Sequence, residues 1–325
     1  RVVEQRVLAS LADTFELHGF GSIETRAVEP MAQLASKGEI DKEIYVVRRL
    51  QAEREGRVDR DELGLHFDLT VPFARYVLEN SGHLTFPFRR YQLQKVWRGE
   101  RPQEGRYREF LQADIDVVGS ESLAAHHDVE VALVILQALE RLHTEFGVPP
   151  VLMRVNNRKL AEGFYRGLGI DDHLAVLQRV DKLDKIGADA VHALLTSELG
   201  LSHEVASACL DLATISAADE SFVERVRALG VRNDLLDEGL AELADVVRAA
   251  AAAVPGRLVA DLKIARGLDY YTGTVYETQM AGFESWGSVA GGGRYDALAS
   301  DGKVTYPGVG ISIGVTRLVQ LLISK

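Results

Sequence analysis

The stretch "ARGLDYYTGTVYE" (265–277) brings together side chains that could bind a phosphate and recognise a polar ligand. Arg266 supplies a guanidinium that stays charged at any working pH, and Tyr270 and Tyr271 supply adjacent phenols. Glycines at 267 and 273 flank this group, just after the apolar run "LVADLKI". Because glycine allows close backbone approach, the pattern favours a segment that closes over a bound ligand.

A second group of cations lies in "WRGERPQEGRYREF" (97–110), between strand-like segments at 89–97 and 111–119. This arrangement predicts a long hairpin loop. Its arginines are Arg98, Arg101, Arg106 and Arg108, partly offset by Glu100, Glu104 and Glu109. Taken alone, such a composition is typical of a solvated charged loop.

The second strand of this hairpin alternates in polarity. Its apolar residues are Leu111, Ala113, Ile115 and Val117, and its polar residues are Gln112, Asp114 and Asp116. Since side chains alternate across a strand, one face is apolar and the other carries an amide and two carboxylates. The polar face could meet water at an edge, or form the floor of a polar site on an open antiparallel sheet. The glycine cluster "AGGGRYDAL" (290–298) could be a strand-end turn or could let backbone approach a phosphate beside Arg294.

The whole-chain composition excludes several classes of protein. With 325 residues, 46% hydrophobic and 26% charged, the chain is a folded one with a large core and room for a smaller second domain. Its single cysteine, Cys209, excludes a disulfide framework and suits the cytoplasm. A net charge of -11 argues against a general polyanion binder. We expect no membrane span and no signal peptide.

Common catalytic motifs are missing from the sequence. There is no P-loop, "GLGID" lacks the glycine spacing of a dinucleotide site, and no nucleophile elbow supports a serine hydrolase. The histidines at 126–127 have no partner at metal-ligand spacing, so we expect no metal site made by protein side chains.

Hydrophobic periodicity predicts strands on both sides of a helical block. Helices are expected at 1–18, 71–80, 122–146, throughout 158–252 and at the C-terminus. Strands are expected at 43–50, 63–69, 89–97, 111–119, 151–157, 257–264, 274–280, 288–293 and 308–314. The predicted fold is α+β, with an antiparallel sheet of six or seven strands flanked by helices. We divide it into a first part (1–160), a helical insertion (161–250) and a second part (251–325).

Several segments together resemble class II aminoacyl-tRNA synthetases, and histidyl-tRNA synthetases in particular. "VWRGERP…YREF" is similar to motif 2, and "GVGISIGVTRL" (308–318) to motif 3. "RGLDYYTG" and "GGGRYD" resemble the two histidine-specific signatures. "HFDLTVPFARYV" (66–77) and "VDKLDKIG" (180–187) are similar to the eukaryotic-type branch. The resemblance covers nearly the whole chain and implies the class II catalytic fold with an inserted α-helical domain.

The sequence departs from the family pattern at two places. Motif 1 is expected at 19–30, where Arg26 replaces the usual proline, and a homodimer is expected around residues 1–30. The anticodon-binding domain expected after motif 3 does not follow. The sequence therefore corresponds either to a catalytic core or to a paralogue without that domain. One such paralogue is the non-catalytic regulatory subunit of ATP phosphoribosyltransferase in histidine biosynthesis.

The resemblance implies activation of L-histidine by ATP with Mg²⁺, then transfer to tRNA(His). Arg98 and Arg266 would hold the α-phosphate, Arg317 the γ-phosphate, and Phe110 and Glu100 the adenine. Asp116 and Tyr271 would read the imidazole beside Tyr270. Asp68, Thr70 and Gln112 would hold the α-ammonium group. In period-2 geometry Gln112 and Asp116 share a face, as do Asp68 and Thr70. Arg101, Gln103, Arg106 and Arg108 are expected to contact tRNA.

Overall fold

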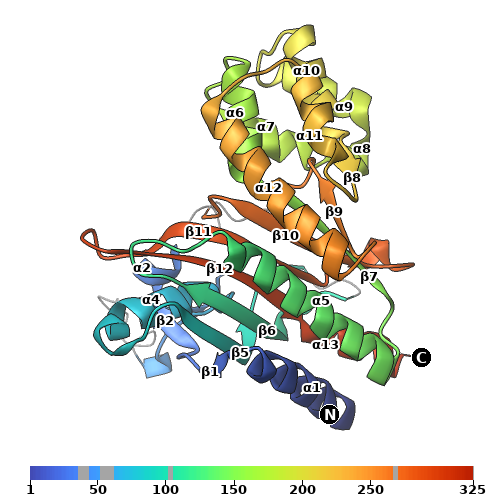
Figure 1. Ribbon diagram of the computed structural model, residues 1–325. Helices are drawn as coiled ribbons and strands as arrows, with labels where there is room; N and C mark the ends of the chain where they lie inside the picture. Colours follow the sequence, from blue (N-terminus) through green and yellow to red (C-terminus); the bar gives the residue numbers. More distant parts are fainter. Residues whose placement is uncertain (36–43, 52–61, 102–104, 266–269, 325) are drawn as a thin grey trace.

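The computed structural model describes residues 1–35, 44–51, 62–101, 105–265 and 270–324 (Figure 1). Its largest element is a nine-stranded sheet with the order β1-β5-β6-β12-β11-β10-β7-β9-β8. The strands are β1 (Gly21–Ser22), β5 (Phe88–Trp97), β6 (Glu109–Val118), β12 (Thr305–Gly314), β11 (Ala290–Ser300), β10 (Thr274–Met280), β7 (Val151–Asn157), β9 (Leu258–Asp261) and β8 (Ser216–Ala217).

The sheet is wider than predicted, and it is mixed. Strands β5 to β7 in this order are antiparallel, whereas β1 pairs with β5, and β9 with β7, in parallel. The prediction of six or seven antiparallel strands is therefore wrong for the sheet as a whole. The outer strands β1 and β8 have two residues each, which is too short to produce an alternating pattern in the sequence.

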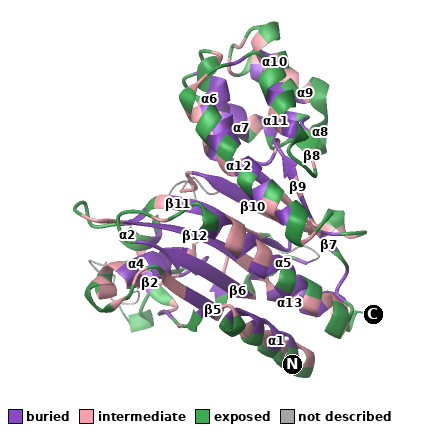
Figure 2. Ribbon diagram, viewed as in Figure 1, coloured by how far each residue is buried: buried purple, intermediate pink, exposed green. Residues whose placement is uncertain are grey.

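One face of the sheet packs against three helices, which are α1 (Val2–Leu17), α5 (His126–Phe146) and α13 (Val315–Ile323). Val7, Leu11 and Phe15 of α1 are fully buried, as the apolar stripe at this spacing predicts. They join Ile115 and Ile311 from the sheet in one hydrophobic cluster. The apolar half of each alternating strand therefore forms the main core. Most of the central sheet is buried (Figure 2).

A smaller layer surrounds α4 (Thr70–Asn80). It contains α2 (Met31–Leu34), the 3-10 helix η3 (Ser81–His83) and a three-stranded sheet of β2 (Val28–Pro30), β4 (Leu63–Leu65) and β3 (Val46–Val47). Phe67, Phe73 and Tyr295 pack in its core. The strands expected at 43–50 and 63–69 are thus much shorter than predicted.

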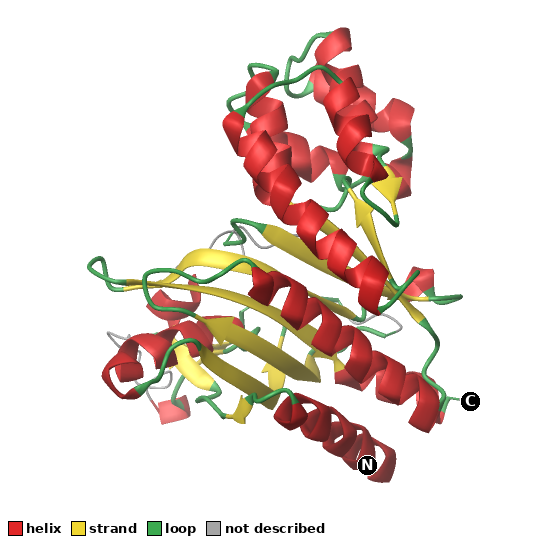
Figure 3. Cartoon of the chain, in the orientation of Figure 1, coloured by secondary structure: helices red, strands yellow, loops and turns green. Residues whose placement is uncertain are grey.

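Residues 158–253 form a helical region above the sheet (Figure 3). Its helices are α6 (Arg158–Gly167), α7 (His173–Val180), α8 (Leu183–Ile186), α9 (Ala188–Ser197), α10 (His203–Ala213), α11 (Ser221–Ala228) and α12 (Asp234–Ala253). The predicted helical character is confirmed, apart from the short strand β8. Asn157 begins α6, because its side-chain oxygen accepts a hydrogen bond from the Lys159 backbone N–H at 2.9 Å.

The last helix of this region, α12, connects it to the sheet. It packs against α6 within the helical region and also against α5, β7 and β9 (Figure 1). A short 3-10 helix, η4 (Glu284–Trp286), lies between β10 and β11. No helix in the described ranges is long and apolar enough to cross a membrane.

Candidate active site

The second face of the sheet carries a polar strip across three strands. On β6 this strip consists of Gln112, Asp114 and Asp116. The register places Arg90 of β5 beside Asp116, and Gly310 of β12 on its other side. Directly paired residues share a face of the sheet, so these polar groups lie opposite the helix-covered core. The predicted shared face of Gln112 and Asp116 is confirmed.

Glycines on β12 leave room for this strip. A methyl group at Gly310 would lie 2.1 Å from Oδ1 of Asp116, and one at Gly308 would lie 2.4 Å from the Tyr295 ring. Contacts this close are impossible, so a side chain at either position would displace the carboxylate or the phenol. The glycines of motif 3 therefore act here by making space.

Asp116 is held by two residues that the sequence did not single out. Its Oδ2 lies 2.6 Å from Nη2 of Arg90, and its Oδ1 accepts a 2.6 Å hydrogen bond from the Tyr295 hydroxyl. Burial raises the pKa of Asp116 to about 6, while the Arg90 charge and the Tyr295 hydrogen bond oppose the rise. Three strands thus fix one carboxylate.

Next to Asp116 lies a short hydrogen-bonded chain. Nε2 of Gln112 donates to Oγ of Ser312 at 2.8 Å, and that hydroxyl donates to Asp114. Oε1 of Gln112 is buried and finds no donor among the described residues. Burial raises the pKa of Asp114 to about 7, against the effect of the nearby Arg90 charge. The unpaired Gln112 oxygen is available to a ligand cation.

Asp68 lies in a loop beside the site. The prediction that Asp68 and Thr70 lie on one face of a strand is therefore wrong. The strand β4 ends at Leu65, and α4 begins at Thr70, so Asp68 and Thr70 do not share a strand face. Instead Oδ1 of Asp68 accepts the Val71 backbone N–H at 3.1 Å, and its Oδ2 accepts the Tyr270 hydroxyl at 3.3 Å. Burial raises the pKa of Asp68. Tyr270 and Tyr271 lie side by side, with ring centres 4.7 Å apart.

Arg98 begins the loop between β5 and β6. Its Nε donates to the Phe67 carbonyl at 3.0 Å, and its guanidinium carbon lies 5.2 Å from the centre of the Phe110 ring. Glu100, a few residues further, lies 3.2 Å from Nη1 of Arg106. Arg98 is thereby anchored to the loop that also carries Asp68.

Arg317 lies in the first turn of α13 and bridges two loops. Its Nε donates to the Gly105 carbonyl at 2.8 Å, and its Nη1 donates to the Ser288 carbonyl. Burial, and then the positive charges of Arg106 and Arg98, lower the pKa of Arg317. Arg317, Arg106 and Arg98 are therefore close enough for their charges to repel. Together they give this region a positive electrostatic potential, which suits the binding of a polyphosphate.

Not every predicted residue can be placed. Arg266 and Gln103 lie outside the described residues. Arg101, Arg106 and Arg108 are exposed along the loop between β5 and β6. Exposure leaves these three side chains accessible to a large partner.

Arg294 does not lie in the polar strip, so a role beside a phosphate on this face is excluded. It pairs in register with Val309, whose side chain is in the main core. Its Nε lies 3.1 Å from Oδ2 of Asp128, and its Nη2 donates to the carbonyls of Leu123 and Ala124. Arg294 therefore ties β11 to the start of α5.

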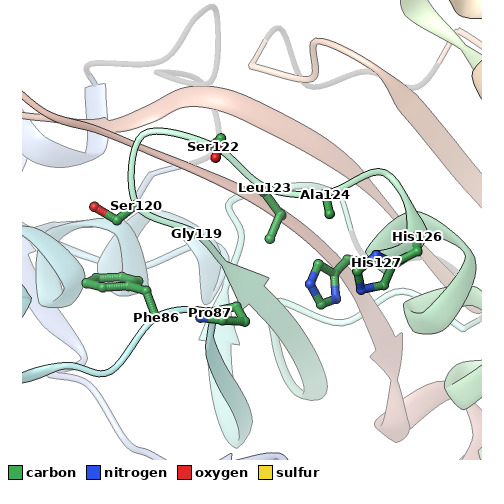
Figure 4. Close-up of a pocket in the computed structure, with 9 residues that line it drawn as sticks. All are labelled: Phe86, Pro87, Gly119, Ser120, Ser122, Leu123, Ala124, His126 and His127. Atoms are coloured by element: carbon green, nitrogen blue, oxygen red, sulfur yellow. The ribbon is translucent and has the colours of Figure 1, made fainter.

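A surface pocket of about 560 Å³ lies where β5 begins and β6 ends (Figure 4). This is the end of the hairpin opposite to the loop that joins the two strands. It is lined by Phe86, Pro87, Gly119, Ser120, Ser122, Leu123, Ala124, His126 and His127. None of the predicted site residues lines it. Within the described part of the chain, no group of three or more histidine, cysteine, aspartate or glutamate side chains is arranged to hold a metal ion.

Comparison with known proteins identifies the family. The family model described as "Histidyl-tRNA synthetase" matches residues 3–318. The histidine–tRNA ligase of Cutibacterium acnes is 68% identical over 326 residues, covering 100% of this chain and 72% of that protein. The histidine–tRNA ligase of Micrococcus luteus is 61% identical over 334 residues, again with 100% and 72% covered. The chain belongs to the histidyl-tRNA synthetase family.

Solved structures agree with this assignment. A histidyl-tRNA synthetase from Nostoc sp. PCC 7120 is 34% identical, with a TM-score of 0.83, over 99% of this chain and 72% of that one. A protein from Bacillus halodurans has a TM-score of 0.82 at 21% identity, and its likeness concerns the fold alone. Its description reads "ATP phosphoribosyltransferase regulatory subunit/histidyl-tRNA synthetase". The α+β class II fold expected for a histidyl-tRNA synthetase is confirmed.

Arg26 is the residue at which the sequence predicts a departure from motif 1 of the histidyl-tRNA synthetase family. Its Nη2 lies 3.4 Å from Oε2 of Glu29 and 3.8 Å from Oε1 of Glu79. Glu29 is buried and also pairs with Arg75 at 2.9 Å. The guanidinium thus has partners within the chain itself.

Proposed function

We propose that this protein is a histidine–tRNA ligase: it activates L-histidine with ATP to histidyl-adenylate and pyrophosphate, then transfers the acyl group to the 3′ end of tRNA(His). The observation that carries this proposal is the buried Asp116 carboxylate, fixed by Arg90 and Tyr295 on the polar strip. A fixed carboxylate beside phenols is what recognition of an imidazole N–H requires.

Amino-acid recognition uses the middle of the strip. Asp116 accepts a hydrogen bond from one imidazole nitrogen, and Tyr271 serves the other, with Tyr270 lining the pocket. Oε1 of Gln112, which has no donor among the described residues, accepts from the α-ammonium group. Asp68 and Thr70 complete this subsite. A side chain without imidazole nitrogens would leave buried polar groups unpaired, and it is rejected for that reason.

Adenylate formation is an in-line attack of the histidine carboxylate on the α-phosphate. Arg98 and Arg266 stabilise the charge that develops on this phosphate, and Arg317 binds the γ-phosphate after exchanging its carbonyl partners for phosphate oxygens. Phe110 stacks on the adenine, and Glu100 meets its amino edge. Arginine suits these positions because its planar fork donates to two oxygens at once. Mg²⁺ enters with ATP and neutralises phosphate charge when it is bound.

The remaining assignments concern partners and organisation. Arg101, Gln103, Arg106 and Arg108 contact the tRNA. The protein acts in the cytoplasm as a homodimer formed around residues 1–30. The helical insertion spans 161–250, between catalytic parts 1–160 and 251–325. Asp116, together with the 66–77 and 180–187 segments, supports membership of the eukaryotic-type branch.

A regulatory subunit without catalysis is the second candidate function. The resemblance implies that such subunits lose several groups that the chemistry needs, above all in the arginine–tyrosine motif. In this chain the full set stands at the expected positions, namely Arg98, Glu100, Gln112, Asp116, Arg266, Tyr270, Tyr271 and Arg317. This completeness favours the enzyme.

The deciding experiment is exchange of labelled pyrophosphate into ATP. We expect exchange that depends on L-histidine and is not supported by any other amino acid, because only an imidazole satisfies both Asp116 and Tyr271. Histidine binding is measured in parallel by calorimetry. A folded sample that binds histidine without exchanging pyrophosphate, with Mg²⁺ present, would instead support the regulatory function.

A further inference from the structure

Arg90 is a charged side chain with no exposed surface. Among the residues that the structure describes, it is the largest fully buried side chain. Its Nη2 meets Asp116 at 2.6 Å, and its Nη1 donates to Oε1 of Gln92 at 3.2 Å. Its guanidinium carbon lies 4.4 Å from the centre of the Phe73 ring. Its Nε has no partner among the described residues.

Stability alone does not account for this arrangement. A buried ion pair gains little or nothing over apolar residues of the same volume, because both charges lose their hydration. An unpaired Nε adds a further cost. The pair nevertheless sits at the centre of the polar strip, and the carboxylate of that pair is the group to which we assign imidazole recognition.

The two partners of Asp116 come from opposite sides. Arg90 of β5 binds Oδ2, and Tyr295 of β11 binds Oδ1, while Gly310 of β12 leaves the space for the carboxylate. Each oxygen therefore has one fixed partner, and the plane of the carboxylate cannot rotate without breaking a hydrogen bond. A single charged residue, Arg90, supplies both orientation and countercharge.

We propose that Arg90 is a positioning residue for amino-acid recognition, which holds Asp116 in place as an ionised acceptor for the imidazole of the substrate. This inference rests on the proposed function. Nη2 of Arg90 also lies 3.4 Å from the Leu69 carbonyl, but the shortest contact of Arg90 is with Asp116, and we assign its effect on histidine binding to that contact.

The surrounding charges explain why a countercharge is needed. Asp114 of β6 and Asp68 of the loop before α4 are further carboxyl groups of the same strip, and Asp68 disfavours a second negative charge at Asp116. Tyr295 faces Asp116 as a neutral phenol, since burial raises its pKa well above the ordinary value. Among the neighbouring groups, the Arg90 charge does most to favour the charged form of Asp116 and so to lower its pKa. Without it, the pKa of Asp116 would be higher still.

The test replaces Arg90 by methionine, which keeps an unbranched stem and removes the charge, and by lysine, which keeps the charge. The matched control is Arg89→Met. Arg89 is the preceding residue, on the other face of β5, where it binds Glu130 at 2.7 Å. KM for histidine and for ATP are measured by pyrophosphate exchange, and histidine affinity by calorimetry.

In Arg90→Met we expect KM for histidine to rise on the order of 10- to 100-fold, with KM for ATP unchanged, because an ionised acceptor is lost. Arg90→Lys should lie between this variant and the wild type. The ratio of variant to wild-type KM should fall as the pH rises above 7, by about tenfold per unit at most, as Asp116 ionises again. The imidazole of the substrate titrates equally in both proteins and cancels from this ratio.

A double-mutant cycle with Asp116→Asn separates this role from a structural one. If Arg90 acts through Asp116, Arg90→Met adds no further loss of histidine affinity once Asp116 is an asparagine. Equal losses in both backgrounds, or an unchanged KM for histidine in a folded Arg90→Met protein, would overturn the inference. If that variant does not fold, a lysine variant with wild-type KM and pH profile overturns it equally. If the wild type itself shows no histidine-dependent exchange, the proposed function falls, and this inference falls with it.

Discussion

The two faces of the central sheet differ in composition, although they are formed by the same strands: one face is apolar and the other is polar. On the face beneath α5, Ile115 and Ile311 are fully or almost fully buried among apolar side chains. On the other face, the neighbouring residues Asp114 and Asp116 are equally buried, but their surroundings are polar and partly unpaired. Burial alone therefore does not distinguish the site from the core. What distinguishes it is a pair of buried carboxyl groups on one strand, beside the unpaired amide oxygen of Gln112.

Two arginines make the comparison concrete. Arg294 on the covered face has an acidic partner and two carbonyl acceptors. Arg98 on the polar face is anchored by the Phe67 carbonyl, and its guanidinium lies over the Phe110 ring. A guanidinium whose N–H groups are hydrogen-bonded within the protein stabilises the fold. One whose N–H groups are partly unused can donate hydrogen bonds to a ligand.

The largest effect is expected from Arg294→Met. It leaves Asp128 buried without its cation, which typically costs about 3–5 kcal/mol of unfolding free energy. Exchange activity per folded molecule should stay within about threefold, since no transition-state contact is lost. Urea unfolding and pyrophosphate exchange on the same sample measure both quantities. Loss of exchange in a protein of normal stability would place Arg294 in the site after all.

Arg98→Met should show the reverse pattern. Removal of one preorganised donor to the reacting phosphate lowers kcat by a factor on the order of 10²–10³. The unfolding free energy should change little, because this side chain is only partly buried. Exchange kinetics beside thermal melting provide the measurement. A variant that melts early and turns over normally would assign Arg98 to the structural class.

The smallest effect concerns pH and Asp114→Asn. In the folded protein the pKa of Asp114 is about 7, above its ordinary value of 3.8. The folded state therefore keeps a proton that the unfolded chain has released, so this contribution to stability is present at low pH and is lost as pH rises through 7. Asparagine cannot ionise. Between pH 5 and pH 8 the stability of the variant relative to the wild type should increase by about 3 kcal/mol.

Urea unfolding of both proteins at several pH values in this range measures the difference directly. The same comparison with a substitution on the covered face, Ile115→Val, gives a control in which the two curves should stay parallel. Parallel curves for Asp114→Asn would mean that Asp114 is already ionised in the folded protein at pH 5.

Much of the fold could be predicted because its signals are local. The period of 3.6 placed α1 and the helical region, and the period of 2 placed the polar face of β6. The segment at 66–70 misled the same reasoning. Asp68 and Thr70 are two positions apart, but the backbone is already turning into α4, where Asp68 accepts the Val71 N–H. Asp68 belongs to the turn that leads into a helix, whereas the sequence pattern predicts a strand at this position.

Contacts between strands were harder to foresee. Arg90 lies seven residues before the end of β5, and Asp116 lies seven residues after the start of β6. In a hairpin whose two strands have equal length on either side of the loop, residues at equal distances from the loop pair with each other. Counting from the loop could therefore have predicted that Arg90 pairs with Asp116. Tyr295 gives no such signal. Its position over Gly308 depends on the register of β11 with β12, which contains an irregularity between Tyr295 and Ala299.

The helix α12 has a mechanical consequence. Its 20 residues extend about 30 Å, from the helical region down to the sheet beside β7 and β9 (Figure 1). An unbroken helix of this length behaves as a stiff rod, so a tilt of about 5° at one end moves the other by roughly 2.6 Å. Force applied to the helical region is thus carried as a lever arm into β7, the strand next to β10. The two regions cannot move independently unless α12 bends.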